Sequence, residues 1–478
     1  MGVNNHAHKV SVQHKYRKGK IERDFTSGPL FKQIVTFSIP IMLTNVLQLV
    51  FNTADIAVLG AISKGGDNAV AAVGATSSLV TLCTILFVGV SIGMNIVVSK
   101  KLGAGDEESV KKLVGMSLPL SLAIGILLVV VGWTASRPLL ILMNCDEDVL
   151  DYAVKYMQIY FSGMPLVMLY NFFSAILRAA GDSKRPLIYL IIGGILNIGF
   201  NVFFVLVLDM DVEGVAIATV IAQGVAAVLA IIRLSHSSGI VRFRFKYAKF
   251  YKKELLEVLR MGVPGGIQSS LFALTNVFIQ STINLFGEQA MAGSSYASQV
   301  ENYVSTALQG VAHAIVSIVS QNHGARKYDR IRKAILYATG INTVAGIILG
   351  LGALFLLKIV VGFITDDAVV IDYAYRRFIG IGPFYFMCGV MNVLSFSIRG
   401  LGKSITAMIV AIFSAGVLRV VWLNVVYALT GDFTVIFTAY PVSWVITIGC
   451  YLAVLIPHIK NLERVARDES IIDETQCA

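Results

Sequence analysis

One isolated carboxylate is the residue in this sequence best placed to do chemistry. Asp55 lies in an apolar stretch and is the only charged residue between Lys32 and Lys64. A charge inside a membrane-spanning helix is costly, and it normally faces the bundle interior or water and serves a function. One alternative stays open. Asp55 is nine residues from Lys64, about 13 Å along a helix, so it could also be solvated near a membrane surface.

Three polar side chains are expected at a depth similar to that of Asp55. Asn197 and Asn201 are four residues apart and therefore share one helix face, and Thr219 lies near the start of the next apolar stretch. Carboxylate, amide and hydroxyl oxygens together suit a hard cation. A protonated Asp55 would instead share hydrogen bonds with the same amides. The four residues therefore predict a cation-coupling site for H+ or Na+.

The second half of the chain has a different pair of deep charges. Glu301 follows the acidic Glu288 at the same sequence distance by which Arg419 precedes Asp432, so both are expected at one depth. Since an unpaired charge there costs at least about 2.5 kcal/mol, we predict a Glu301–Arg419 ion pair that faces a central cavity. It would either hold two helices together, or bind cationic substrates or gate the cavity. Further polar candidates for the cavity are Gln268, Asn276 and Gln280.

The composition places all these residues in a membrane protein. Of the 478 residues, 56% are hydrophobic and only 14% are charged, whereas an average soluble protein has about 25% charged residues. A nucleic-acid-binding module is therefore excluded despite the net charge of +10. The five cysteines have no paired spacing, so neither a disulfide framework nor a thiolate metal site is expected. We expect no catalytic residue, no enzyme activity and no cofactor.

Stretches of about 20 apolar residues predict transmembrane helices. We count twelve, at residues 31–60, 70–99, 112–134, 149–175, 186–208, 213–234, 255–286, 290–320, 333–357, 369–397, 404–429 and 434–457. Lys and Arg gather in one set of loops, above all between spans six and seven, and the opposite loops are acidic. This pattern places both termini in the cytoplasm, in a multi-pass protein of the inner or plasma membrane.

The two halves of the chain are a repeat. One constant shift in residue number, which we call the repeat shift, carries Arg178, Gly181 and Ser183 onto Arg399, Gly402 and Ser404, and Gly103 onto Gly324. Because six spans per half is an even number, both copies have the same orientation and are related by a pseudo-two-fold axis along the membrane normal. The predicted fold is therefore an all-α integral membrane protein with twelve transmembrane helices in two six-helix lobes.

The same pattern predicts five regions along the chain. They are a basic cytoplasmic tail (1–28), an N-lobe with spans 1–6 (29–234), a cytoplasmic linker (235–254), a C-lobe with spans 7–12 (255–458) and a C-terminal cytoplasmic tail (459–478).

Six longer motifs follow one another along the chain: FNTADIAVLG at 51–60, GVSIGMNIVVSKKLGAGD at 89–106, NFFSAILRAAGDSKRP at 171–186, LNIGFNVFFVL at 196–206, SQNHGARKYDR at 320–330 and SIRGLGKS at 397–404. Their order and spacing resemble those of the MATE family of multidrug and toxic compound extrusion transporters. The resemblance extends from about residue 30 to about residue 457.

This resemblance implies a function. In such transporters two lobes surround a cavity that opens alternately to the cytoplasm and the outside, and an inward-moving proton or sodium ion drives export of amphipathic, often cationic, organic compounds. Asp55, Asn197 and Thr219 match the family's cation-site positions and are the expected ligands if the ion is Na+. Asn201 departs from the pattern, because many members have a second Asp there, and this favours protons. Small organic molecules and membrane lipids are the expected partners of a monomer.

Two other functions remain open. A flippase for lipid-linked saccharide precursors belongs to the same superfamily, but it usually needs a strongly cationic cavity, and Arg419 is the only basic residue expected deep in a span. An integral-membrane transferase needs paired carboxylates for Mg2+ near the membrane surface. The acidic run 106–108 lies among lysines, which is typical of a solvated turn.

Overall fold

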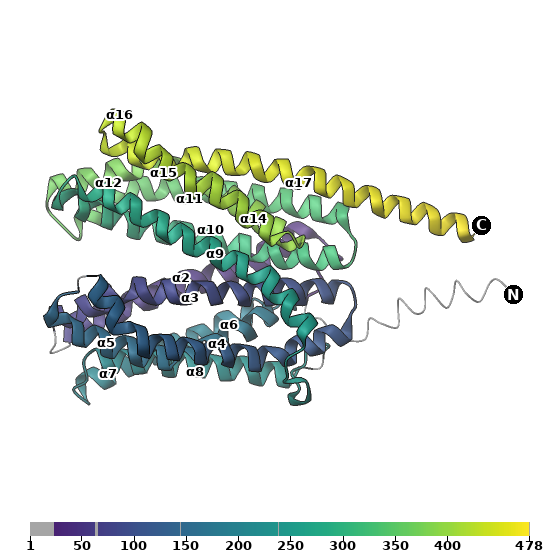
Figure 1. Cartoon of the computed structure of the whole chain (residues 1–478), viewed down its shortest axis with the longest axis horizontal. Coiled ribbons are helices and arrows are strands. Elements are labelled where there is room, and N and C mark those ends of the chain that lie inside the picture. The colour runs from purple at the N-terminus through teal and green to yellow at the C-terminus, as the bar shows by residue number, and fades with distance from the viewer. Residues whose placement is uncertain (1–22, 63–65, 144, 238, 478) are drawn as a thin grey trace.

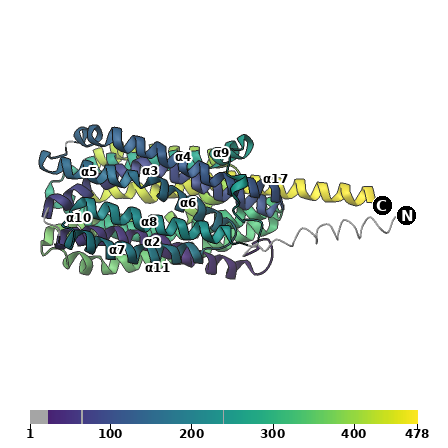
Figure 2. The same cartoon turned by 90° about the horizontal axis from the view of Figure 1, so that it is seen from below.

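The computed structural model describes residues 23–62, 66–143, 145–237 and 239–477, and residues 1–22 of the predicted basic tail lie outside these ranges. All the regular secondary structure in the described ranges is helical. Figure 1 shows two bundles, α2–α8 below and α9–α17 above, which we call the N-lobe and the C-lobe. Their helices run nearly parallel to the long axis, and α17 extends beyond the others at one end (Figure 2).

The N-lobe consists of α2 (Leu30–Ile62), α3 (Gly66–Gly103), α4 (Glu107–Leu142), α5 (Glu147–Ser162), α6 (Met164–Ala179), α7 (Lys184–Leu206) and α8 (Val212–Ser235). Helices α5 and α6 together form one span with a bend of 47°. The bend falls at Gly163, and Pro165 follows in the first turn of α6, a position where its missing N–H costs nothing.

The C-lobe follows a linker that contains the short helix η2 (Phe245–Tyr247). It consists of α9 (Lys252–Asn284), α10 (Glu288–Gly324), α11 (Tyr328–Gly362), α12 (Ala368–Ile381), η3 (Gly382–Phe384), α13 (Tyr385–Gly400), α14 (Ser404–Ala411), η4 (Ile412–Val417), α15 (Leu418–Trp422), η5 (Leu423–Tyr427), α16 (Ala428–Thr430) and α17 (Phe433–Cys477). Both η4 and η5 are π-helical turns. They lie within the span that runs from α14 to α16.

Each predicted span corresponds to one helix or to consecutive helices. Ten described segments are long and apolar enough to cross a membrane, and the bent pair α5–α6 is an eleventh. Helix α9, the predicted seventh span, is less apolar, because it begins with charged residues and carries polar side chains, but it packs along α3. Helix α17 continues through the predicted C-lobe boundary at 458 and ends at Cys477.

The structure repeats local geometry at positions related by the repeat shift. Gly181 and Gly402, in the turns after α6 and α13, both have φ +85°, a left-handed conformation that glycine adopts without a steric penalty. Asp146 and Asp367 cap α5 and α12, and their carboxylates accept hydrogen bonds from the backbone N–H two residues on. Turns and caps of the two lobes thus follow the sequence repeat.

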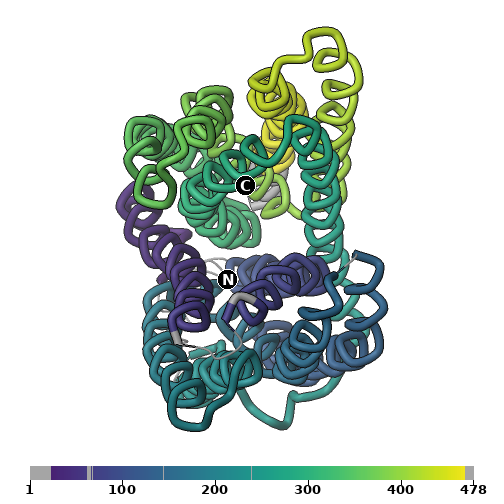
Figure 3. Tube along the Cα trace, turned by 90° about the vertical axis from the view of Figure 1, so that its left-hand side faces the viewer, coloured from purple at the N-terminus to yellow at the C-terminus, as the bar shows by residue number. Residues whose placement is uncertain are grey.

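The lobes meet closely at the end of the molecule that carries the linker and the last turns of α17, which we call the linker end (Figure 1). There α3 of the N-lobe crosses α10 of the C-lobe. A Cβ on Gly103 would overlap the carbonyl of Gln321, and a Cβ on Gly324 would overlap the carbonyl of Lys100. The repeat shift exchanges these two contacts, so the crossing lies on the pseudo-two-fold axis. Figure 3 views the two bundles along the helices from the opposite end.

The segment before α2 also joins the lobes at the linker end. The N–H of Arg23 donates to the carbonyl of Ala180 in the N-lobe (3.3 Å). Phe25 is fully buried, and its backbone N–H and C=O bond to the side chains of Gln321 and Asn322 of α10, each at 3.1 Å. This segment therefore contacts both lobes at once.

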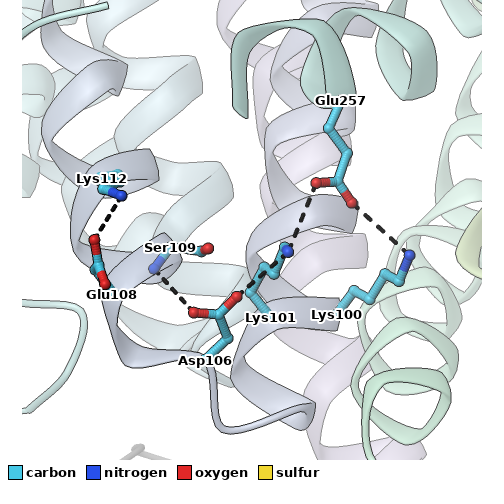
Figure 4. Close-up of polar contacts among 7 residues, drawn as sticks. All are labelled: Lys100, Lys101, Asp106, Glu108, Ser109, Lys112 and Glu257. Atoms are coloured by element: carbon cyan, nitrogen blue, oxygen red, sulfur yellow. Dashed lines mark hydrogen bonds and ion pairs between the residues drawn. The ribbon is translucent and has the colours of Figure 1, made fainter. Parts of the chain in front are cut away.

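Charged side chains add weaker contacts at the same place (Figure 4). Lys100 and Lys101 of α3 reach Glu257 of α9 at 3.8 and 3.9 Å. These side chains are partly exposed, and such surface pairs contribute about 0–1 kcal/mol. Helix packing and the buried Phe25, more than the ion pairs, hold the linker end closed.

Candidate functional site

A cavity of about 410 Å³ lies in the N-lobe, lined mainly by side chains from α2, α6, α7 and α8, with contributions from α3, α5 and α10. Asp55, Asn197 and Thr219 line this cavity. Asp55 is only 6% exposed, so the alternative of a solvated surface carboxylate does not hold in this structure.

The four residues of the predicted cation site come together around Asp55. The side-chain amide of Asn201 donates to Asp55 Oδ1 at 2.6 Å. Thr219 Oγ1 lies 3.4 Å from Asp55 Oδ2 and 3.0 Å from the carbonyl of Val215, and its single hydrogen can serve only one of these acceptors at a time. Asn197 Nδ2 donates to Thr219 Oγ1 at 3.2 Å. Helices α2, α7 and α8 thus each contribute to one polar cluster.

Two acceptor atoms of this cluster are buried without a partner. Asn197 Oδ1 and Asn201 Oδ1 make no hydrogen bond to any described residue. No basic side chain in the described part of the chain forms an ion pair with Asp55, whose hydrogen bonds come from Asn201 and Thr219. A buried negative charge beside unused amide oxygens is stabilised by a cation or removed by protonation. The cluster is chemically suited to either.

A second cavity, of about 300 Å³, lies in the C-lobe. It is lined by side chains from α9, α10, α12, α13, α15 and α17. Gln309 of α10 lines this cavity and the N-lobe cavity alike, so the two adjoin between the lobes. The charged lining residues of the C-lobe cavity are Glu301, Arg377 and Arg419.

The predicted Glu301–Arg419 pair is wrong. Both carboxylate oxygens of Glu301 accept hydrogen bonds from Arg377 of α12, each at 2.8 Å. Arg377 also donates to Ser294 at 2.6 Å and is 6% exposed. The sequence places Arg377 beside Arg376 near the start of a span, where it resembles an outer loop residue. Its depth becomes visible only because α12 packs along α10.

Arg419 therefore lines the cavity without Glu301. Its Nε donates to Ser443 Oγ at 3.0 Å, and its guanidinium lies over the ring of Tyr440, 4.2 Å from the centroid. Among the described residues no carboxylate forms an ion pair with it, since Glu301 bonds Arg377 instead. Arg419 is 6% exposed.

The other candidates for the substrate cavity divide. Asn276 and Gln280 line the C-lobe cavity, where Asn276 Oδ1 bonds the Tyr440 hydroxyl at 3.3 Å. Gln268 lines neither cavity. Its Oε1 accepts a hydrogen bond from Arg399 at 2.6 Å, which makes it a structural contact.

Sequence reasoning missed three residues of the C-lobe cavity and its surroundings, namely Arg377, Ser294 and Tyr440. The only available signal for Arg377 was a basic residue inside a predicted span. Ser294 and Tyr440 carry no comparable signal, because a single hydroxyl in a span commonly bonds the backbone of its own helix.

Two all-helical lobes with adjoining polar cavities between them define a membrane transporter for small molecules. Searches with known proteins agree with this class. The MatE family model matches the chain twice, at residues 40–203 and 264–425, once in each lobe. The chain belongs to the MatE family, so the predicted family and its transporter class are confirmed.

Individual relatives are more distant. The probable multidrug resistance protein YoeA of Bacillus subtilis is 28% identical over 80% of this chain and 84% of its own length. The multidrug export protein MepA of Staphylococcus aureus is 23% identical over 85% of this chain and 90% of its own. A MATE family transporter solved in an outward-facing conformation matches with a TM-score of 0.84 and 22% identity, over 92% of this chain and 98% of its own. This likeness confirms the two-lobe fold.

Proposed function

We propose that this protein is a secondary active multidrug exporter, which exchanges H+ or Na+ for amphipathic, often cationic, organic compounds. The observation that carries the proposal is the buried Asp55, unpaired with any described basic residue and surrounded by Asn197, Asn201 and Thr219. The names of the relatives, which describe multidrug resistance and export, supply the substrate class.

The cation and the compound would act on adjoining cavities. Binding of an inward-moving H+ or Na+ at Asp55 would neutralise the carboxylate and change the interactions among α2, α7 and α8, which line the N-lobe cavity. The compound would occupy the space between the lobes, next to Gln309. Alternating access then requires the close contacts at the linker end to separate when the cavity opens to the other side.

The proposal includes an orientation. We infer that the linker end, which carries Lys100, Lys101 and the basic linker, faces the cytoplasm of a cell whose plasma membrane holds the protein as a monomer among lipids. Both termini would then be cytoplasmic. The cavities would be open to the outside in this conformation, because the lobes contact each other at the linker end.

Transport in everted membrane vesicles tests this function. Ethidium uptake into the vesicles is measured while a proton gradient and a sodium gradient are imposed separately. We expect uptake with at least one gradient and none with vesicles that lack the protein. If neither gradient drives uptake, the coupled exporter is excluded, and the gradient that works identifies the ion.

A further inference from the structure

We infer that the C-lobe cavity contains a subsite for a carboxylate group of the transported compound, with Arg419 as its binding residue. This deepens the proposed function, on which it rests, by naming a substrate class: amphipathic aromatic carboxylates, including zwitterions that also carry an amine. A cavity specialised for cations alone would instead offer an unpaired acid.

The charges that line the cavity are the first step. Glu301 and Arg377 neutralise each other through two hydrogen bonds of 2.8 Å. Arg419 is the remaining charged lining residue, so the lining has a net positive charge. Because an isolated charge at this depth is unfavourable, the cavity attracts an anionic group.

The guanidinium is held in a geometry that suits a carboxylate. Its Nε–H bonds Ser443, and one face lies against Tyr440. The described residues provide no hydrogen-bond partner for the two terminal nitrogens. All five N–H groups of a guanidinium lie in its plane, so stacking on Tyr440 leaves the edge free. An in-plane carboxylate can then accept two parallel hydrogen bonds, the arrangement for which arginine is preferred over lysine.

The helix that carries Arg419 has an unusual local structure. Arg419 lies in the single α-helical turn α15, between the π-helical turns η4 and η5. Such turns are rare and occur frequently at functional sites. The same cavity also offers the aromatic walls of Phe272, Tyr385 and Trp444. Arg419 would therefore hold the carboxylate and the aromatic side chains the ring system.

A matched pair of probes tests the subsite. Norfloxacin carries a carboxylate and an amine, and its ethyl ester keeps the amine but lacks the acid. We would measure the dissociation constant of each for the purified full-length protein in phosphatidylcholine nanodiscs, by equilibrium dialysis. Because a bidentate contact to a buried arginine stabilises the acid, we expect the acid to bind about tenfold tighter or more. Equal binding of acid and ester by the unmodified protein would overturn the subsite.

Substitutions locate the preference. We expect the acid-to-ester ratio to fall close to one in Arg419→Gln, to be intermediate in Arg419→Lys, and to be unchanged in Arg376→Gln. Arg376 is a matched control, because it is half-exposed and pairs with Asp372 on its own helix. A ratio that persists in Arg419→Gln contradicts the assignment. If Arg419→Gln does not fold, the ratio in Arg419→Lys and in the unmodified protein decides.

Two further arms separate the causes. Nanodiscs with phosphatidylglycerol should leave the ratio unchanged, whereas loss of acid binding there would mean that a lipid phosphate occupies the site and would overturn the proposal for transported carboxylates. Ethidium, which has no acid, should bind to Arg419→Gln at least as tightly as to the unmodified protein. Weaker ethidium binding would mean that Arg419 shapes the cavity instead of binding the carboxylate. Gradient-driven ethidium uptake reports separately on the proposed function, so a failed exporter and a failed subsite give different results.

Discussion

The two lobes share a scaffold but hold opposite unpaired charges. Asp55 in the N-lobe has no described basic partner, and Arg419 in the C-lobe has no described acidic partner. The repeat places Ile279 at the position of Asp55 and Ile198 at the position of Arg419. Caps and glycine turns recur in both lobes, whereas the charged groups do not. The repeat thus preserves helix packing, and each lobe is free to have its own chemistry.

The largest effect is expected from Asp55→Asn. This change removes the titratable and cation-binding group but keeps the shape and the hydrogen bond to Asn201. Export driven by an ion gradient should fall to the level of vesicles without the protein, while the amount in the membrane stays the same. Asp366→Asn, an exposed acid of the C-lobe, is the control and should export normally. Normal export by Asp55→Asn would show that the lobes do not differ in the way proposed.

The buried ion pair of the C-lobe should have the next largest effect, on stability. Removing one partner leaves an uncompensated buried charge, which costs about 3–5 kcal/mol. Glu301→Gln and Arg377→Gln should each lower the melting temperature clearly, whereas Asp372→Asn, in the exposed pair with Arg376, should change stability by less than about 1 kcal/mol. A double-mutant cycle of Glu301 and Arg377 measures the coupling. Coupling near zero would contradict the pairing.

A third change would make the N-lobe site more acidic. Asn201→Asp places a second carboxylate against Asp55, and we expect the affinity for Na+ to rise by about tenfold or more. Two carboxylates that share a site also push one pKa upward, so the pH optimum of export should move. Sodium titrations of export at several pH values check both. Asn424→Asp, at an exposed position of the C-lobe, should leave both responses unchanged.

The smallest effect is expected at a helix cap. Asp106 caps α4 through the Ser109 N–H at 3.1 Å and contacts Lys101 at 3.4 Å (Figure 4). Lys327, its counterpart under the repeat shift, provides no side-chain cap to α11. Partial burial raises the pKa of Asp106, but hydrogen bonds from Ser109 and the charge of Lys101 lower it by more, so the net pKa is below its ordinary value.

A lowered folded-state pKa stabilises the protein above the unfolded pKa, and this contribution is lost as the pH falls through the folded value. Asp106→Ala should therefore cost about 1 kcal/mol at neutral pH, and the difference should disappear below about pH 4. Thermal unfolding of both proteins across pH measures this. A difference that persists in acid would mean that the carboxylate charge is not responsible.

Much of the fold was predictable from the sequence, because it depends on local patterns. Apolar stretches mark the spans, and the repeat marks which turns recur, such as those at Gly181 and Gly402. The predicted cluster around Asp55 was also accessible, since i,i+4 spacing and depth along a helix are fixed by helical geometry. Its role in coupling stays a prediction.

The C-lobe pairing was not predictable in the same way. Depth alone made Arg419 as good a partner for Glu301 as any other base, but depth does not say which helix faces which. Arg377 reaches Glu301 because α12 lies against α10, and Ser294 fixes its orientation. Ion pairs between spans depend on rotation about each helix axis, which a single sequence does not determine.

The crossing of α3 and α10 has a consequence for the timing of transport. Gly103 and Gly324 each lie against a main-chain carbonyl of the other helix, so the contact exists only at one separation and is lost entirely when the helices part. Intermediate separations keep little of its energy, because dispersion attraction falls steeply over a fraction of an ångström. The crossing therefore favours two discrete populations over a continuum, and the free-energy difference between them sets how long each arrangement persists.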